Sequence, residues 1–265
     1  MNKQADYIKK IDIKGLWGRK DISWTLRPDV NILSGINGIG KSTILNNSIN
    51  MLSNHTQIGV SFEFYPEDSN FIKFDVIRSF DRPLINAELL EKIGNANVKT
   101  ELDWQLYQLQ RRYLDYQVNI GNRIIELLTS GNPEDQIKAT EVSRPKARFQ
   151  DLIDQLFSET GKKIIRKSNE IQFEQLGETL TPYQLSSGEK QMLVILLTVL
   201  VQDNQHATLF MDEPEVSLHI EWQQKLIYNI KQLNPNVQII LTTHSPAVIM
   251  DGWMDAVTEV SDITL

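Results

Sequence analysis

The sequence predicts an α/β fold with a mainly parallel sheet, an N-terminal region of antiparallel strands and a helical insertion. A short apolar run at 30–33 leads through a glycine-rich loop into a helical pattern, and a second apolar run at 208–211 ends in two carboxylates. Between them lies a long segment whose apolar residues recur every three or four positions, as in a helix. Strands that alternate with helices favour a parallel sheet.

The N-terminal part has the pattern of strands. Ile8, Ile11 and Ile13 lie in an extended, partly alternating stretch. Further strand-like runs follow at 21–26, 30–33, 58–64 and 71–77. The run at 30–33 is short and apolar, as expected for a buried parallel strand. From Ile44 the apolar residues recur at helical spacing, so this region should form strand, loop and helix.

Residues 84–160 are predicted to form the helical insertion, and residues 1–83 and 161–265 the main domain. A heptad-like apolar stripe extends from Leu102 to Leu127. Asn132-Pro133 and Ser143–Pro145 are typical of helix starts, because proline is tolerated in the first helical turn. After the insertion, strand-like segments surround a predicted turn at 168–169. The pattern then predicts a buried helix at 191–201, a strand at 208–211, an amphipathic helix at 226–233 and a strand at 237–241.

Composition limits the classes of protein that fit the sequence. The chain has 265 residues and a net charge of −7, which argues against nucleic-acid binding by the whole surface. It contains no cysteine, and its four histidines lie far apart, so no short metal-binding motif is present. The longest apolar run, Met192–Val201, has about half of the twenty or so residues needed to span a bilayer. We therefore expect no membrane association and a cytoplasmic location.

The loop at 35–42 reads Gly-Ile-Asn-Gly-Ile-Gly-Lys-Ser and fits the pattern GxxxxGK[ST]. Its glycines let successive N–H groups turn toward an anion, and the helix that follows adds the positive end of its dipole. ATP and Mg²⁺ are the expected ligands. Lys41 would reach the β- and γ-phosphates, and Ser42 would bind Mg²⁺. The nucleotide-binding residues predicted here are Asn37, Gly38, Gly40, Lys41, Ser42 and Thr43.

Three further motifs carry candidate site residues. After the apolar run at 208–211, Asp212 is predicted to hold Mg²⁺ and Glu213 to orient or deprotonate the attacking water. At 185–191 the chain reads Leu-Ser-Ser-Gly-Glu-Lys-Gln, which suits ordinary helix capping and also offers a second anion site. His244 follows the run at 237–241. A neutral imidazole near a γ-phosphate could respond to the change of charge on hydrolysis.

Together these motifs resemble those of ABC-class ATPases, over residues 7–83 and 162–260. The segment at 185–191 is similar to the ABC signature, and the resemblance implies a P-loop NTPase with ABC-ATPase head architecture. It implies a homodimer that sandwiches two nucleotides, with a higher oligomer left open. Lys41, Glu213 and His244 would be catalytic, the last as the switch histidine. The residues implied to act on the partner's nucleotide are Ser186, Ser187, Gly188 and Glu189.

The segment after Asp-Glu-Pro reads Glu-Val-Ser-Leu-His at 215–219 and resembles soluble ABC ATPases related to SMC, RecF and OLD proteins. Transporter ATPases differ there. The family usually has a glutamine loop near 76–81, but this sequence has no glutamine there. That role falls to Ser79 or Asp81, or is absent. Arg19 and Trp17 lie where related proteins contact the base and phosphates, although Trp17 fits a core position equally well.

The resemblance implies a soluble AAA-family ATPase that controls a separate effector, a nuclease or another toxin, as in bacterial anti-phage defence. The chain ends at Leu265, so the effector is expected on another polypeptide. The alternative is a RecF-like DNA-repair ATPase that binds DNA directly. A group of basic residues between 138 and 167 is the candidate for nucleic-acid contact, although a solvated face is the simpler interpretation. A transporter subunit is disfavoured, and a scaffold with weak hydrolysis stays open.

Overall fold

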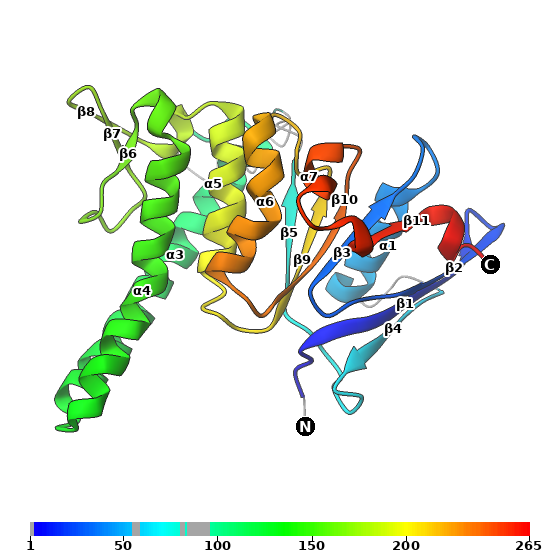
Figure 1. Cartoon of the computed structure of the whole chain (residues 1–265), viewed down its shortest axis with the longest axis horizontal. Coiled ribbons are helices and arrows are strands. Elements are labelled where there is room, and N and C mark those ends of the chain that lie inside the picture. Colours follow the sequence, from blue (N-terminus) through cyan, green and yellow to red (C-terminus); the bar gives the residue numbers. More distant parts are fainter. Residues whose placement is uncertain (1–2, 55–58, 80–82, 84–95) are drawn as a thin grey trace. The chain divides into compact units, whose positions relative to one another are not determined.

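The computed structural model describes residues 3–54, 59–79, 83 and 96–265 (Figure 1). The chain forms two compact units. The first contains residues 1–79, 204–231 and 235–265, and the second contains residues 80–203 and 232–234. The second unit includes the segment predicted as a helical insertion and extends beyond it through residues 161–203.

The main sheet of the first unit is parallel, as predicted. Its five strands lie in the order β11-β3-β10-β9-β5. Their bounds are Val30–Ser34 for β3, Phe74–Arg78 for β5, Ala207–Asp212 for β9, Val237–Thr242 for β10 and Val257–Glu259 for β11. Strand β10 is buried along its whole length, and β3 and β9 are buried except at their last residue. This burial explains why these strands read as continuous apolar runs.

A second, antiparallel sheet completes the first unit, with the order β2-β1-β4. Its strands are β1 (Tyr7–Leu16), β2 (Lys20–Thr25) and β4 (Val60–Tyr65). Helix α1 (Lys41–Asn54) packs against β4 of this sheet and against β9 and β10 of the parallel sheet. The buried core accordingly combines Ile11 of β1 and Ile44 of α1 with Phe210 of β9. Helices α6 (Ile220–Leu233) and α7 (Pro246–Met250) follow β9 and β10.

The second unit is built on three long helices and a small antiparallel sheet. The helices are α3 (Glu101–Thr129), α4 (Pro133–Leu156) and α5 (Ser187–Leu200), and the strands are β6 (Lys163–Ile164), β7 (Phe173–Gln175) and β8 (Glu178–Leu180). The predicted stripe of α3 is buried from Leu102 to Ile120. Helices α3 and α4 pair as a hairpin (Figure 1). Short 3₁₀ helices lie at Ser158–Thr160, Pro182–Gln184, Met254–Ala256 and Val260–Ile263.

No helix in the described part of the chain has the length and apolar character needed to cross a membrane.

The predicted helix start at Ser143–Pro145 is wrong, because α4 continues through Pro145. The true start is at Asn132, whose side chain accepts a hydrogen bond from the Glu134 N–H at 3.1 Å. Proline inside a helix removes one backbone hydrogen bond and strains the preceding turn. The buried side chains of Phe149, Leu152 and Ile153 lie further along the same helix, and their packing offsets that cost.

Pro145→Ala should stabilise the second unit by about 1–2 kcal/mol, since the new N–H can complete the helix. The gain is smaller than the full helix penalty because alanine also gives the unfolded chain more freedom. Pro133→Ala is the matched control: it changes the first helical position, where the N–H has no helical partner. Urea unfolding would measure both, and a Pro145→Ala protein less stable than wild type would contradict the argument.

Candidate nucleotide-binding site

The glycine-rich loop joins β3 to α1, as the sequence predicted. Gly38 and Gly40 adopt φ values of 80° and 114°, in the region that favours glycine. Lys41 is buried, and its Nζ donates to the carbonyl oxygens of Gly35 at 2.9 Å and Ile36 at 3.3 Å. The ammonium group is therefore held against the loop itself, so its charge is available to an anion bound by the loop's N–H groups.

The two predicted Mg²⁺ ligands lie together. Ser42, in the first turn of α1, donates its hydroxyl to Asp212 Oδ1 at 3.0 Å. Thr242, at the end of β10, donates to the same oxygen at 2.5 Å. A hydroxyl and a carboxylate are the hard oxygen ligands that Mg²⁺ prefers, usually with few protein ligands beside phosphate and water. Among the described residues no cluster of three or more histidine or acidic side chains could hold a metal ion.

Glu213 and His244 also come together at this edge of the sheet. His244 Nε2 lies 3.4 Å from Glu213 Oε1, and both side chains are partly exposed. Glu213 has a φ of 48°, which is costly for a residue with a side chain. Its N–H is bonded to the carbonyl and the hydroxyl oxygen of Thr242, both at 3.1 Å. These bonds hold the backbone so that a carboxylate and an imidazole face the same space.

Sequence reasoning missed Glu215. Its Oε1 accepts hydrogen bonds from the Thr243 hydroxyl and from the N–H groups of His244 and Ser245. The available signal was its place two residues after Glu213, but the sequence alone did not indicate its donors.

Trp17 lies on the phosphate loop and not in the core. Its side chain is 52 % exposed, and its indole ring lies so close to Gly40 that a Cβ atom there would overlap it. The core interpretation of Trp17 is therefore wrong. Arg19 is exposed in the same turn between β1 and β2. Glycine at position 40 is required both by its φ value and by the indole ring above it.

The residues predicted to replace the glutamine loop are only partly described. Ser79 is buried directly after β5, whose Arg78 pairs with Asp212 of β9. Asp81 lies outside the described residues. The role of these two positions stays a prediction.

The signature segment opens α5 in the second unit and confirms the capping interpretation. Ser186 is the N-cap, and it forms a capping box with Glu189. Glu189 is buried, and its Oε2 accepts from the Ser186 N–H and hydroxyl, both at 2.9 Å. Its Oε1 accepts from the Thr160 hydroxyl and Lys162 Nζ, also at 2.9 Å. Both oxygens of Glu189 are thus occupied within its own unit, whereas Ser186 and Ser187 are exposed.

Burial alone would raise the pKa of Glu189. Hydrogen bonds from Ser186 and Thr160 and the ion pair with Lys162 outweigh it and hold the pKa of this carboxyl below its ordinary value.

A second buried ion pair joins α5 to α3. Lys190 Nζ lies 2.8 Å from Asp103 Oδ1, and both side chains are largely buried. The other oxygen of Asp103 accepts the N–H groups of Lys99 and Thr100 at the start of α3. Sequence reasoning missed this pair, because 87 residues separate its members. The start of α5 is therefore tied to the start of α3 by a buried charge pair.

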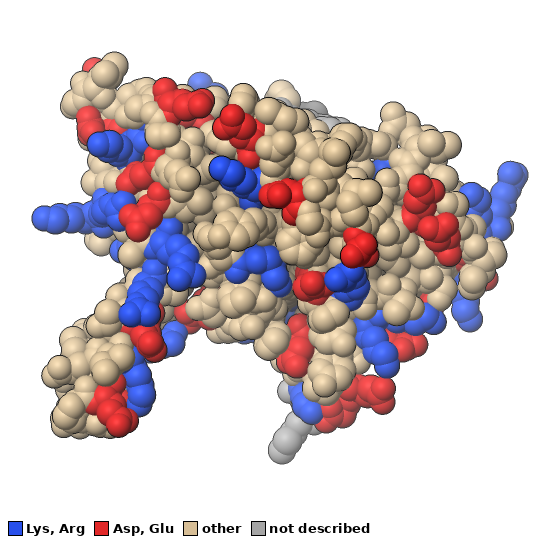
Figure 2. All heavy atoms as spheres, viewed as in Figure 1, with Lys and Arg blue, Asp and Glu red and all other residues tan. Residues whose placement is uncertain are grey.

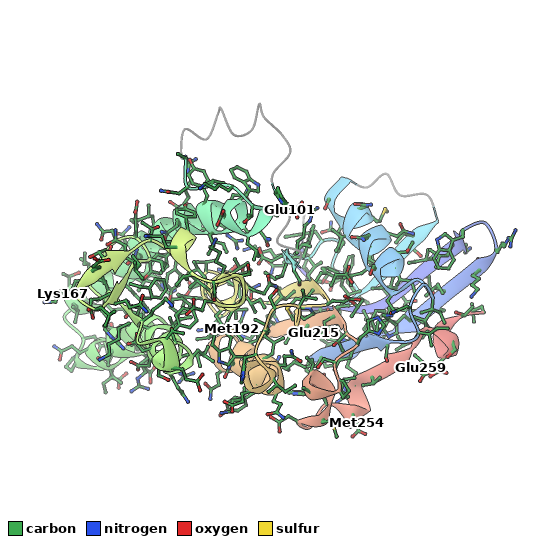
Figure 3. All side chains as sticks on the ribbon, turned by 90° about the horizontal axis from the view of Figure 1, so that it is seen from above. Glu101, Lys167, Met192, Glu215, Met254 and Glu259 are labelled. Atoms are coloured by element: carbon green, nitrogen blue, oxygen red, sulfur yellow. The ribbon has the colours of Figure 1, made fainter. Side chains whose placement is uncertain are left out.

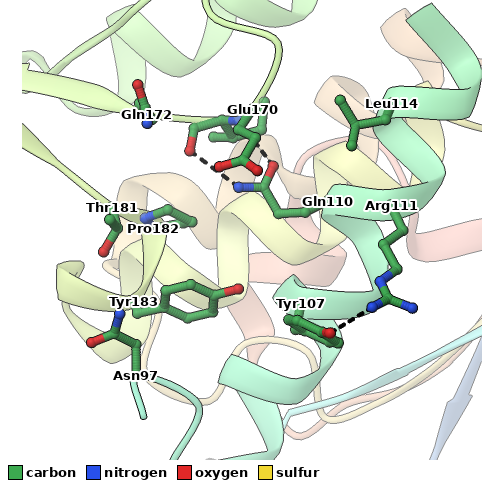
Figure 4. Close-up of a pocket in the computed structure, with 11 residues that line it drawn as sticks. Asn97, Tyr107, Gln110, Arg111, Leu114, Glu170, Gln172, Thr181, Pro182 and Tyr183 are labelled. Carbon is green, nitrogen blue, oxygen red and sulfur yellow. Dashed lines mark hydrogen bonds between the residues drawn. The ribbon is translucent and has the colours of Figure 1, made fainter. Parts of the chain in front are cut away.

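A pocket of about 370 Å³ lies beside the signature segment in the second unit (Figure 4). Tyr107 and Tyr183 supply aromatic walls, and Arg111 donates to the Tyr107 oxygen at 2.6 Å. Burial raises the pKa of Tyr183 to about 12, so its phenol is neutral at physiological pH. The lining carries one carboxylate, Glu170, and one guanidinium, so it favours neither sign of ligand charge. The sequence did not predict this pocket.

Most of the basic residues proposed for nucleic-acid contact have partners inside the second unit. Lys138 pairs with Asp135, Lys162 with Glu189, and Arg166 with Asp151 and Asp154. Two others bond to neutral groups, Lys146 to Gln117 and Arg148 to the Gln232 carbonyl. Basic and acidic side chains are mixed on the face shown in Figure 2. This pairing favours the solvated-face interpretation.

The family model described as "AAA domain, putative AbiEii toxin, Type IV TA system" matches residues 77–251. That range contains the signature, Asp212, Glu213 and His244, and the phosphate loop precedes it. The Septu protein PtuA of Bacillus thuringiensis is 27 % identical over 91 % of this chain and 72 % of its own length. The retron Vc95 probable ATPase of Vibrio cholerae is 24 % identical over 60 % of this chain. The chain spans about a third (32 %) of that relative's length.

Two solved structures are similar to this chain in fold. A structure of the SmcHead bound to the C-winged helix domain of ScpA has a TM-score of 0.53 at 16 % identity, covering 92 % of this chain and 91 % of the other. An Smc head domain with an extended coiled coil, bound to the C-terminal domain of ScpA derived from Pyrococcus furiosus, has a TM-score of 0.51 at 13 % identity, with the same coverage. The fold is therefore that of an SMC head.

Glu189→Gln should lower the stability of the second unit at neutral pH by about 1–3 kcal/mol, since it leaves the partly buried Lys162 without its counter-charge. The pKa of Glu189 is lower in the folded protein than its ordinary value of 4.5. The ionised carboxylate therefore contributes to folding stability above pH 4.5, and this contribution is lost as the pH falls through the folded pKa. Urea unfolding at falling pH should show the difference from wild type shrinking. Glu178→Gln, at an exposed strand position, is the control. If the difference in unfolding free energy between Glu189→Gln and wild type did not change with pH, the role given to the Glu189 charge would be contradicted.

Gly40→Ala should weaken ATP binding about tenfold or more. Strain of about 1–3 kcal/mol at such a φ value lowers affinity by at least that factor when it opposes the bound loop conformation, since about 1.4 kcal/mol corresponds to tenfold. Gly177→Ala is the control: its φ of 83° carries similar strain, but nothing lies near the new Cβ. Titration calorimetry with ATP and Mg²⁺ would measure affinity. Adding Trp17→Ala to Gly40→Ala should restore part of the lost ATP affinity. If the double variant bound ATP no better than Gly40→Ala, the indole ring would not be the obstacle.

Proposed function

Because the chain belongs to the AAA-domain family described as "putative AbiEii toxin, Type IV TA system", we propose that it binds and hydrolyses ATP with Mg²⁺. One observation carries the proposal. Lys41, Ser42, Asp212, Glu213 and His244, which are spread over 204 positions of the chain, are brought to one edge of the parallel sheet. Ligands of parallel α/β sheets bind at the carboxyl ends of the strands, which is this edge.

In this proposal each residue has a role in hydrolysis. The N–H groups of the phosphate loop and Lys41 would bind the β- and γ-phosphates. Ser42 and Asp212 would hold Mg²⁺, which offsets the negative charge of the phosphates. Glu213 would orient the attacking water and accept its proton, since its carboxylate is partly exposed and lies beside His244. His244 would donate a hydrogen bond to the γ-phosphate, where charge accumulates during the reaction.

The proposal includes a homodimer that closes around ATP. In the resembled ABC ATPases, the signature of one subunit contacts the nucleotide of the other, and here Ser186, Ser187 and Gly188 would do so. Ser186 and Ser187 are exposed at the start of α5. Glu189 is buried and bonded within its unit, so we assign it to positioning Ser186 and not to nucleotide contact. A larger assembly built from such dimers stays compatible with this scheme.

We further propose that the dimer controls a separate effector, a nuclease or other toxin, in bacterial anti-phage defence, and that it works in the cytoplasm. Bacterial ATPases of this build resemble components of such systems. Two proteins similar to this chain are named as a Septu protein and a retron ATPase. The RecF-like alternative, in which this chain itself binds DNA, has less support. Most basic residues of the group between 138 and 167, which would contact the DNA, are paired with acidic or neutral partners.

Glu213→Gln should trap an ATP-bound dimer, because the binding groups remain while the water is no longer activated. Lys41→Ala should lose most ATP affinity and stay monomeric. Size-exclusion chromatography with light scattering, with and without ATP and Mg²⁺, would measure the mass, and phosphate release would measure turnover. The exposed α6 variants Glu221→Gln and Lys225→Ala are the matched controls. A Glu213→Gln protein that stays monomeric at saturating ATP would rule out the sandwich.

A further inference from the structure

Glu215, labelled in Figure 3, lies in the turn after β9. The residue is only 9 % exposed. Its carboxylate faces the segment that follows β10. Oε1 accepts from the Thr243 hydroxyl at 2.5 Å, from the His244 N–H at 3.0 Å and from the Ser245 N–H at 3.2 Å. Three consecutive residues therefore share one acceptor. Charge-assisted bonds of this kind to backbone N–H groups fix the course of the chain.

The same segment is held from a second side. The Ser245 hydroxyl donates to Gln223 Oε1 at 2.6 Å, and Gln223 Nε2 donates to the Leu218 carbonyl at 2.9 Å. Ser245 also caps α7 by accepting from the Ala247 N–H at 3.2 Å. Gln223 thus joins the beginning of α6 to the loop before it and to the His244 segment.

The second oxygen of Glu215 is buried, and no donor among the described residues reaches it. A buried carboxylate with one unpaired oxygen costs stability. Packing therefore does not explain why a carboxylate occupies this buried position, whereas its three hydrogen bonds at Oε1 do.

We infer that Glu215 is a positioning residue for His244. Its Oε1 sets the backbone at 243–245 so that the imidazole lies 3.4 Å from Glu213 Oε1. This inference rests on the proposed ATPase function. Glu215 is not a substitute for Glu213 as the base, because its Oε1 already accepts three hydrogen bonds and the residue is buried.

A pair of conservative variants separates the acceptor from the charge. Glu215→Gln keeps an oxygen at the Oε1 position and loses the charge, whereas Glu215→Asp keeps the charge and withdraws the oxygen by one methylene. We expect Glu215→Asp to lower kcat about tenfold with KM for ATP within about threefold, and Glu215→Gln to retain kcat within about threefold. A Glu215→Gln enzyme as slow as Glu215→Asp, or a Glu215→Asp enzyme at the wild-type rate, overturns the inference.

A double-mutant cycle tests whether the effect passes through His244. In a His244→Ala background, Glu215→Asp should change kcat by less than about twofold, because the side chain that it positions is absent. If the effects of Glu215→Asp and His244→Ala on kcat simply multiplied in the double variant, Glu215 would have a general structural role, and the inference would be overturned.

A third readout does not depend on turnover. In nucleotide-free Glu215→Asp, the imidazole NMR signals of His244 should shift relative to wild type. The signals of His206, the control, should stay unchanged. In Glu215→Gln, the His244 signals should match those of wild type. Wild-type protein without ATPase activity would refute the proposed function, and the His244 signals would still test the positioning. Unshifted His244 signals in Glu215→Asp would refute the positioning even in an active ATPase.

Discussion

A single carboxylate oxygen, Asp212 Oδ1, joins the three segments that carry the proposed nucleotide site. It accepts hydrogen bonds from Ser42, in the first turn of α1, and from Thr242, at the end of β10. This convergence follows from the register of the sheet, in which Thr242 pairs with Asp212. A slip of one residue would turn Asp212 to the other face of β9. The register is firmly set, because β9 and β10 are buried along nearly their whole length.

Two residues with strained backbone lie just beyond this edge. Glu213 and Ser217 have φ values of 48° and 69°, where residues with side chains are uncommon. The surrounding bonds hold Glu213 there, because Thr242 binds its N–H twice. Without them the backbone would relax toward an ordinary conformation, and the Glu213 carboxylate would leave His244. The same threonine therefore bonds Asp212 through its side chain and Glu213 through its acceptor oxygens, so the two carboxylates proposed for the site share one support.

Local patterns predicted the parts of the site that depend on neighbours in sequence. The strand-loop-helix at 30–52 and the carboxylates after β9 could be placed because their chemistry is contained in short motifs. Side-chain partners that come from distant segments could not be predicted. Glu215 meets residues 28 to 30 positions away, and Lys190 meets Asp103 across 87 positions. The helix start at 143–145 was wrong for the related reason that tertiary packing overrides the local preference of proline.

The signature segment shows how the second unit limits the freedom of its own loop. Glu189 and Lys190 are adjacent, yet they pair in separate directions, with Lys162 and with Asp103. A shift of the start of α5 would break one or both pairs and leave buried charges unpaired, which is strongly unfavourable. The start of α5 is therefore expected to move together with the start of α3 and the turn at 160–162. In the proposed dimer, a partner's nucleotide would meet serine and glycine groups that are already ordered, so little binding energy would be lost in arranging them.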